Sequence, residues 1–93
     1  MTVRIIIADD ADLIILGAQA VLKSAPHLDV VGQARCMSDL LIAVENERPD
    51  VVIMSEWIHN VDILSAVEQI RQLSPNVRII VMGGLVDGML IHD

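Results

Sequence analysis

The sequence contains almost no aromatic residues. Its 93 residues include no Phe and no Tyr, and Trp57 is the only aromatic side chain. Because hydrophobic residues nonetheless make up 54% of the chain, its core must consist of aliphatic side chains and methionine. A chain of this length forms one small domain at most. An apolar fraction this high is more than one small core needs, so it predicts an exposed apolar surface and a partner that covers it.

Basic residues and cysteine are also scarce. Six Lys and Arg residues stand against 13 acidic ones, which gives a net charge of −7, and the basic residues are scattered. Because nucleic-acid binding needs clustered positive charge to neutralise phosphates, we expect no DNA or RNA binding by this segment. The single Cys36 cannot form an internal disulfide, which favours a reducing, cytoplasmic setting. No apolar run has the length of a signal-peptide core or a membrane span.

Short apolar runs alternate with amphipathic segments along the chain. The runs predict strands and the amphipathic segments predict helices. The predicted strands are Val3–Ala8, Leu28–Ala34, Val51–Met54 and Val77–Met82, and the predicted helices are Leu13–Ala25, Asp39–Glu47 and Asp62–Leu73. Asp12 and Ser38 are the expected caps of the first two helices. This order predicts an α/β fold with a parallel sheet and helices on both faces.

Polar residues follow three of the predicted strands. The carboxyl ends of parallel strands meet at one edge of the sheet, where functional groups gather. Those ends carry Asp9-Asp10, Ser55-Glu56 and Gly83-Gly84, which we therefore expect to lie close together. The adjacent carboxylates of Asp9 and Asp10 have two interpretations: they bind a divalent cation, or they cap the following helix.

Five segments, which together span nearly the whole chain in order, follow one family pattern: Arg4–Asp10, Asp29–Ala34, Arg48–Met54, Ile70–Pro75 and Ile79–Met82. They resemble the receiver domain of two-component response regulators, in particular the NarL/FixJ subfamily. The resemblance implies a flavodoxin-like fold with strand order 2-1-3-4-5. It also implies that a histidine kinase transfers a phosphoryl group to an aspartate at the end of the third strand.

The chain departs from that family pattern at the residues that carry the chemistry. Ser55 occupies the position of the phosphoacceptor aspartate, and Gly83 stands where the family has Thr or Ser. The family's lysine has no counterpart, because the only lysine, Lys23, lies in the first predicted helix. Asp9 and Asp10 are then a vestigial metal-binding pair that binds magnesium weakly if at all. We therefore expect a non-enzymatic, degenerate receiver that needs no cofactor.

The family pattern also includes a last strand and a last helix, which we do not expect residues 1–93 to form. Without the last strand and last helix, residues 1–93 would form a single incomplete receiver-like domain. Leu85–Asp93 is long enough for one or two helical turns, which would leave the fourth strand as an exposed edge. We expect a homodimer or another protein partner to cover the incomplete sheet. Ile15 and Trp57 are the predicted interaction anchors, although Trp57 has the equal alternative of folding over the unused site.

Three alternatives stay open at the level of the sequence. The chain could be a residual phosphorylation-dependent switch that uses Asp9, Asp10 or Ser55. It could instead bind a small ligand in the vacated pocket near Asp9, Ser55 and Gly83. It could also be a fragment of a longer DNA-binding regulator. Glu56 is expected to face solvent, because side chains alternate in direction along an extended chain.

Overall fold

The computed structural model describes residues 2–56, 62–82 and 89–92. Its elements are, in chain order, β1 (Val3–Ala8), α1 (Asp12–Lys23), β2 (Leu28–Ala34), α2 (Met37–Glu47), β3 (Val51–Ser55), α3 (Ile63–Leu73), β4 (Arg78–Met82) and β5 (Met89–His92). The order of elements from β1 to β4 is the predicted one, and each boundary lies within two residues of its predicted position.

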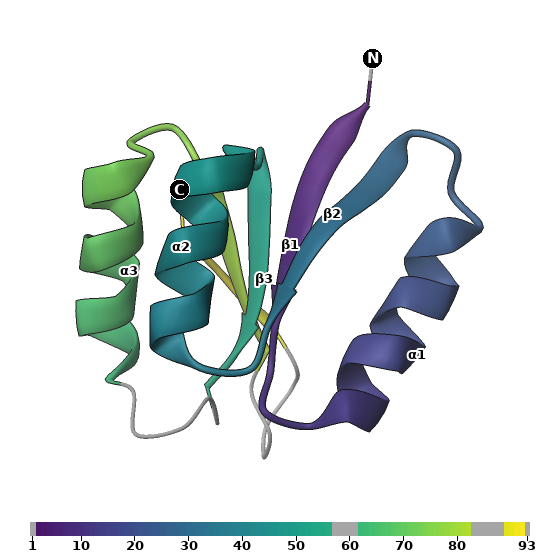
Figure 1. The fold of residues 1–93 in the computed structure, drawn as a ribbon, viewed down its shortest axis with the longest axis horizontal. Helices are drawn as coiled ribbons and strands as arrows, with labels where there is room; N and C mark the ends of the chain where they lie inside the picture. The colour runs from purple at the N-terminus through teal and green to yellow at the C-terminus, as the bar shows by residue number, and fades with distance from the viewer. Residues whose placement is uncertain (1, 57–61, 83–88, 93) are drawn as a thin grey trace.

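The strands form one sheet in the order β2-β1-β3-β4-β5. The first four strands are parallel to one another. Helix α1 lies on one face of the sheet, and α2 and α3 lie together on the other (Figure 1). The predicted fold class, an α/β receiver-like sheet with helices on both faces, is therefore confirmed. Gly32 lies on the edge strand β2, next to a register shift in its pairing with β1.

The end of the chain differs from the prediction. Residues Met89–His92 form a strand that runs antiparallel to β4, with Val81 opposite Leu90. The expected helical turns and the expected exposed edge at β4 are both wrong. A four-residue segment is too short for a stable helix, and pairing with β4 satisfies backbone groups that an open edge leaves unpaired. The described residues contain neither a fifth parallel strand nor a helix after β4.

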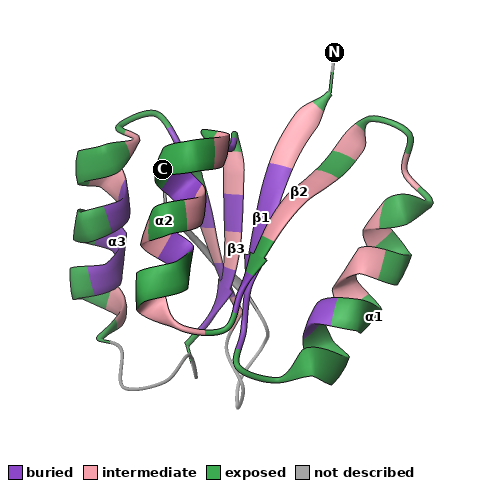
Figure 2. Cartoon of the chain, in the orientation of Figure 1, coloured by how far each residue is buried: buried purple, intermediate pink, exposed green. Residues whose placement is uncertain are grey.

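Alternating side chains divide the core between the two faces of the sheet. Ile6 and Ala8 belong to the larger cluster, which lies between the sheet and the helices α2 and α3. Ile5 and Ile7 belong to a smaller cluster beneath α1. The pattern of burial in Figure 2 follows this division, with buried residues on the inward sides of α2 and α3. Within the described residues, the face beneath α2 and α3 therefore buries more core side chains than the face beneath α1.

The orientation of α1 corrects the prediction for Ile15. Its side chain is 0% exposed and packs with Ile5 and Ile7, so it is a core residue and no interaction anchor. The cause is helical periodicity, because positions 15, 18 and 22 lie on the same side of the helix. Ala18 and Leu22 pack against the same cluster.

The positions at which α1 and α2 begin contradict the predicted N-caps of both helices. The N-caps of α1 and α2 are Ala11 and Cys36, and neither makes a side-chain capping hydrogen bond. Asp12 and Ser38 therefore lie inside the first turns and are not the caps. Helix α2 begins at Met37, whose side chain packs against the larger core cluster and extends the helix toward its N-terminus.

Candidate functional site

A buried aspartate and a buried serine lie next to each other at the carboxyl edge of the sheet. Asp9 follows β1 and Ser55 ends β3, directly after the paired residues Ala8 and Met54. Adjacent strands lie about 4.8 Å apart, so residues at matching positions are close neighbours that face the same side. Asp9 is 6% exposed and Ser55 is 4% exposed. In Figure 1 these two strand ends lie at the lower edge of the sheet.

The backbone holds Asp9 in a fixed position. Its Oδ1 accepts a hydrogen bond from the Ala11 N–H at 2.9 Å, and its own N–H donates to the Ala34 carbonyl at 3.0 Å. The first contact closes a turn of the kind that Asp side chains favour. Asp10, in contrast, is exposed. The structure therefore separates the acidic pair into one buried residue that shapes the turn and one residue in solvent.

Ser55 occupies the junction between three strands. The preceding residue, Met54, pairs with Ala8 of β1, and Ser55 itself pairs with Met82 of β4. The Glu56 N–H donates to the Met82 carbonyl at 3.1 Å, while its side chain is exposed as predicted. Gly83 and Trp57 lie outside the described residues, so the predictions about them stay predictions. The role of Ser55 as a former phosphoacceptor position is likewise a prediction.

An ion pair near this edge was not apparent from the sequence. Arg35 follows β2, and its Nε contacts Oδ1 of Asp12 at the start of α1. The two residues are 23 positions apart, and no local pattern links them. Because both side chains are more than half exposed, the pair adds little to stability. It does give Asp12, the acidic residue nearest to the Asp9-Asp10 pair in sequence, a cationic partner from within the chain.

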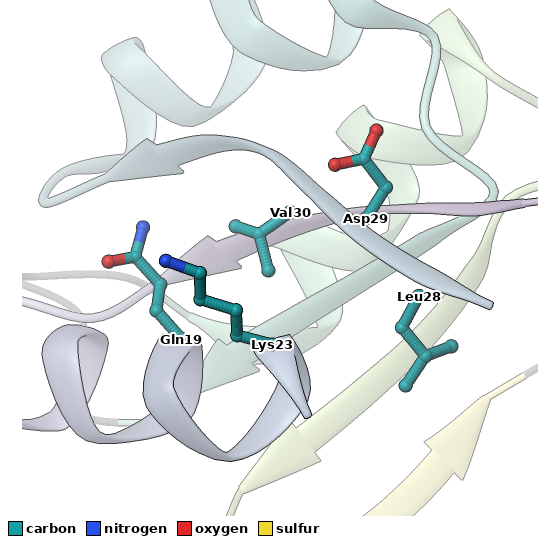
Figure 3. Close-up of a pocket in the computed structure, with 5 residues that line it drawn as sticks. All are labelled: Gln19, Lys23, Leu28, Asp29 and Val30. Atoms are coloured by element: carbon teal, nitrogen blue, oxygen red, sulfur yellow. The ribbon is translucent and has the colours of Figure 1, made fainter. Parts of the chain in front are cut away.

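The metal and ligand predictions are not tested by the described residues. Within them, no three His, Cys, Asp or Glu side chains are grouped so that they could hold a metal ion. A pocket of about 330 Å³ lies between α1 and β2 (Figure 3). Its lining residues are Gln19, Lys23, Leu28, Asp29 and Val30. It includes neither Asp9 nor Ser55, so it is not the vacated pocket that the sequence suggests.

The fold is that of the doubly wound α/β proteins, which have a parallel sheet with helices on both faces. These proteins bind their ligands at the carboxyl edge of the sheet, where Asp9 and Ser55 lie here. The model of one such family, the response regulator receiver domain, matches residues 5–91. The chain belongs to this family, the receiver domains of two-component signalling. None of the described helices is long and apolar enough to cross a membrane.

Similar proteins include full-length response regulators. The chain is 22% identical over 87 residues to the response regulator protein VraR of Staphylococcus saprophyticus, a match that covers 94% of this chain and 42% of VraR. It is 30% identical over 80 residues to the response regulator GacA of Pseudomonas aeruginosa, which covers 86% of this chain and 37% of GacA. The chain thus spans less than half the length of these relatives.

Solved structures show the same fold. The response regulator domain of Thermotoga maritima CheB superposes with a TM-score of 0.84 at 23% identity, covering 94% of this chain and 64% of that one. The signal receiver domain of NarL from Mycobacterium tuberculosis gives a TM-score of 0.81 at 22% identity, covering 92% and 69%. The resemblance seen in the sequence is therefore confirmed at the level of family and fold.

Proposed function

We propose that this chain is a degenerate receiver module of a two-component-type signalling or transcription regulator. It acts through contacts with other proteins, without aspartyl phosphorylation and without enzymatic activity, in a cytoplasmic setting. The observation that carries this proposal is the buried hydroxyl of Ser55 at the end of β3, beside Asp9. In our interpretation of the sequence, Ser55 stands at the position of the family's phosphoacceptor aspartate.

The chemistry of phosphoryl transfer supports the proposal. An acyl phosphate forms only on a carboxylate, and Ser55 offers a hydroxyl in its place. Phosphoryl transfer also depends on cations that stabilise the charge of the transferred group. The only lysine, Lys23, lines the pocket beside the first residues of β2, and Arg35 is paired with Asp12. Lys23 therefore lines a pocket that excludes Asp9 and Ser55, and Arg35, although near their edge of the sheet, is engaged by Asp12.

The same substitution weakens magnesium binding. Magnesium requires nearly octahedral oxygen coordination and relies on carboxylates. With a serine at position 55, a metal ion at this edge would have Asp9 and Asp10 as its carboxylate ligands. Oδ1 of Asp9 already accepts the hydrogen bond from Ala11, and Asp10 is exposed. We propose that resident magnesium is not part of the working state.

The proposed partners are proteins. Solved relatives include RcsB from Salmonella enterica serovar Typhimurium bound to promoter rprA in the presence of phosphomimetic BeF3−, and two RcsB dimers bound to two parallel DNAs. We propose for this chain a homodimer or a complex with another protein. We propose no direct contact with nucleic acid, because the six basic residues are scattered and 13 acidic residues outnumber them, which leaves a net charge of −7.

The test is incubation with magnesium and acetyl phosphate, followed by intact mass spectrometry. We expect no phosphate adduct on this chain under conditions that label a receiver domain with an intact phosphoacceptor aspartate. A stoichiometric, acid-stable adduct on Ser55 would contradict the proposal. An adduct that alkali removes from Asp9 or Asp10 would favour the alternative, a residual phosphorylation-dependent switch at the same edge.

A further inference from the structure

The structure contains a cavity at the amino edge of the sheet, opposite the edge where Asp9 and Ser55 lie. In Figure 1 it is the upper edge, at which β1 and β3 begin. The cavity has a volume of about 410 Å³ and is formed by the start of β1 and by the segments that lead into β3 and β4. Small-molecule sites typically measure about 300–1,000 Å³, so the size of this cavity suits a small ligand.

The backbone holds one acidic residue, Asp50, in the lining of this cavity. The Arg4 N–H donates to Oδ2 of Asp50 at 2.8 Å, and the Asp50 N–H donates to the Arg4 carbonyl at 2.8 Å. The Arg78 N–H donates to the Asp50 carbonyl at 3.0 Å. These bonds join Asp50 to β1 on one side and to β4 on the other. Its carboxylate is therefore fixed, while the second oxygen, Oδ1, accepts no hydrogen bond from any described residue.

Arg78 brings the opposite charge to the same cavity. It pairs with Val51 across β3 and β4, and paired residues of adjacent strands project from the same side of a sheet. The Arg78 side chain makes no hydrogen bond or ion pair with any described residue, whereas Arg4, at the same edge, is paired with Glu47. The lining therefore holds a carboxylate and a guanidinium that do not pair with each other.

Aliphatic side chains form the apolar part of the lining. Val77 is 2% exposed, and Val3 and Val51 are half-buried. All three pack against the core, so this part of the lining is firmly held. Asn76 adds a side-chain amide, which both donates and accepts hydrogen bonds. Among the described residues the lining contains no aromatic side chain, so it suits an aliphatic group better than a ring that stacks.

We propose that this cavity binds a small zwitterion with an aliphatic group, the class to which free aliphatic amino acids belong. The Arg78 guanidinium donates to the carboxylate of the ligand, which matches its planar set of N–H groups. The Asp50 carboxylate accepts hydrogen bonds from the ammonium group, and the valines contact the aliphatic group. A ligand with only a negative charge would be repelled by Asp50, and one with only a positive charge would be repelled by Arg78. The inference goes beyond the proposed function and does not depend on it, because the two sites lie at opposite edges of the sheet.

Isothermal titration calorimetry of the 93-residue chain with L-leucine tests this inference. We expect saturable binding of one leucine per chain. The matched probes are 4-methylpentanoate, which lacks the amino group of leucine, and 3-methylbutylamine, which lacks its carboxylate. Each is expected to bind at least about tenfold more weakly than leucine, because each loses one hydrogen-bonded charge pair. No saturable binding of leucine at millimolar concentrations, or equal binding of the three probes, would overturn the inference.

Two variants separate the charged contacts. Arg78→Gln is expected to weaken the binding of leucine at least about tenfold but not that of 3-methylbutylamine, which has no carboxylate to lose. Asp50→Asn keeps an oxygen that can accept from the Arg4 N–H, and it is expected to weaken the binding of leucine but not that of 4-methylpentanoate. Circular dichroism should show that both variants keep the helical content of the parent chain.

The matched control is Arg48→Gln. Arg48 is an exposed arginine two residues before Asp50, and it does not line the cavity. The control should bind leucine as the parent chain does, and an equal loss of binding in Arg48→Gln and Arg78→Gln would overturn the inference. Lys23→Gln tests the other cavity, between α1 and β2. Loss of leucine binding in Lys23→Gln but not in Arg78→Gln would place the ligand there and would also overturn the inference.

Discussion

Ile15→Ala is expected to lower the free energy of unfolding by about 2–4 kcal/mol. The side chain is 0% exposed and packs with Ile5 and Ile7 in the small cluster beneath α1. Removing it leaves a cavity in a cluster that has few other members to fill the space. The larger cluster on the opposite face cannot compensate, because the sheet separates the two. Urea denaturation followed by circular dichroism measures the change.

The matched control for Ile15→Ala is Leu64→Ala. Leu64 is also an aliphatic helix residue, but it lies on α3 and is 67% exposed. Its loss is expected to change stability by less than about 0.5 kcal/mol. Equal effects of the two substitutions would show that Ile15 does not lie in the core, and would favour the role of interaction anchor that the sequence suggested.

Ser55→Asp is expected to destabilise the chain by about 3 kcal/mol more than Ser55→Asn. Ser55 is 4% exposed and its neighbour Asp9 is 6% exposed, so the substitution places two carboxylates together in a buried position. Asn has nearly the same size and shape as Asp but carries no charge. The difference between the two variants therefore isolates the electrostatic cost from the cost of fitting a larger side chain.

Magnesium should reverse part of this loss in the aspartate variant only. A third carboxylate beside Asp9 and Asp10 supplies the ligand that the parent chain lacks. At a magnesium concentration ten times the dissociation constant, the stabilisation is about 1.4 kcal/mol. Thermal unfolding with and without magnesium measures it. If Ser55→Asp and Ser55→Asn were equally stable and equally insensitive to magnesium, Asp9 and Ser55 would not form one site.

The alternation of strands and helices could be predicted because each element has a strong local pattern. The buried strands are continuous apolar runs, and α3 repeats its buried residues Ala66, Val67 and Ile70 at helical spacing. The family segments then fixed the order of the strands. The antiparallel strand β5 could not be predicted, because four residues show no period and their pairing with β4 is a contact between separate parts of the chain.

The local sequence pattern could predict neither which side of α1 faces the sheet nor which of Asp9 and Asp10 is buried. Residues 13–16 are all apolar, so this turn alone does not show which of them faces the sheet, although Ile15 shares one side of the helix with Ala18 and Leu22. Asp9 and Asp10 are adjacent, and only the direction of β1 at its end decides that the first is buried and the second exposed. The pairing of Arg35 with Asp12 depends on the tertiary fold, since it joins the end of β2 to the start of α1.

Beryllofluoride, the phosphomimetic present in a solved structure of the relative RcsB, gives the most direct test of a receiver that works without phosphorylation. Two-dimensional ¹H–¹⁵N spectra of the chain should be recorded with magnesium, before and after beryllofluoride is added. We predict that the amide signals of Ala8, Asp9 and Ser55 stay in place throughout the titration. Saturable shifts of these signals that require both magnesium and beryllofluoride would show a site competent for a phosphoryl group and would contradict the proposed function.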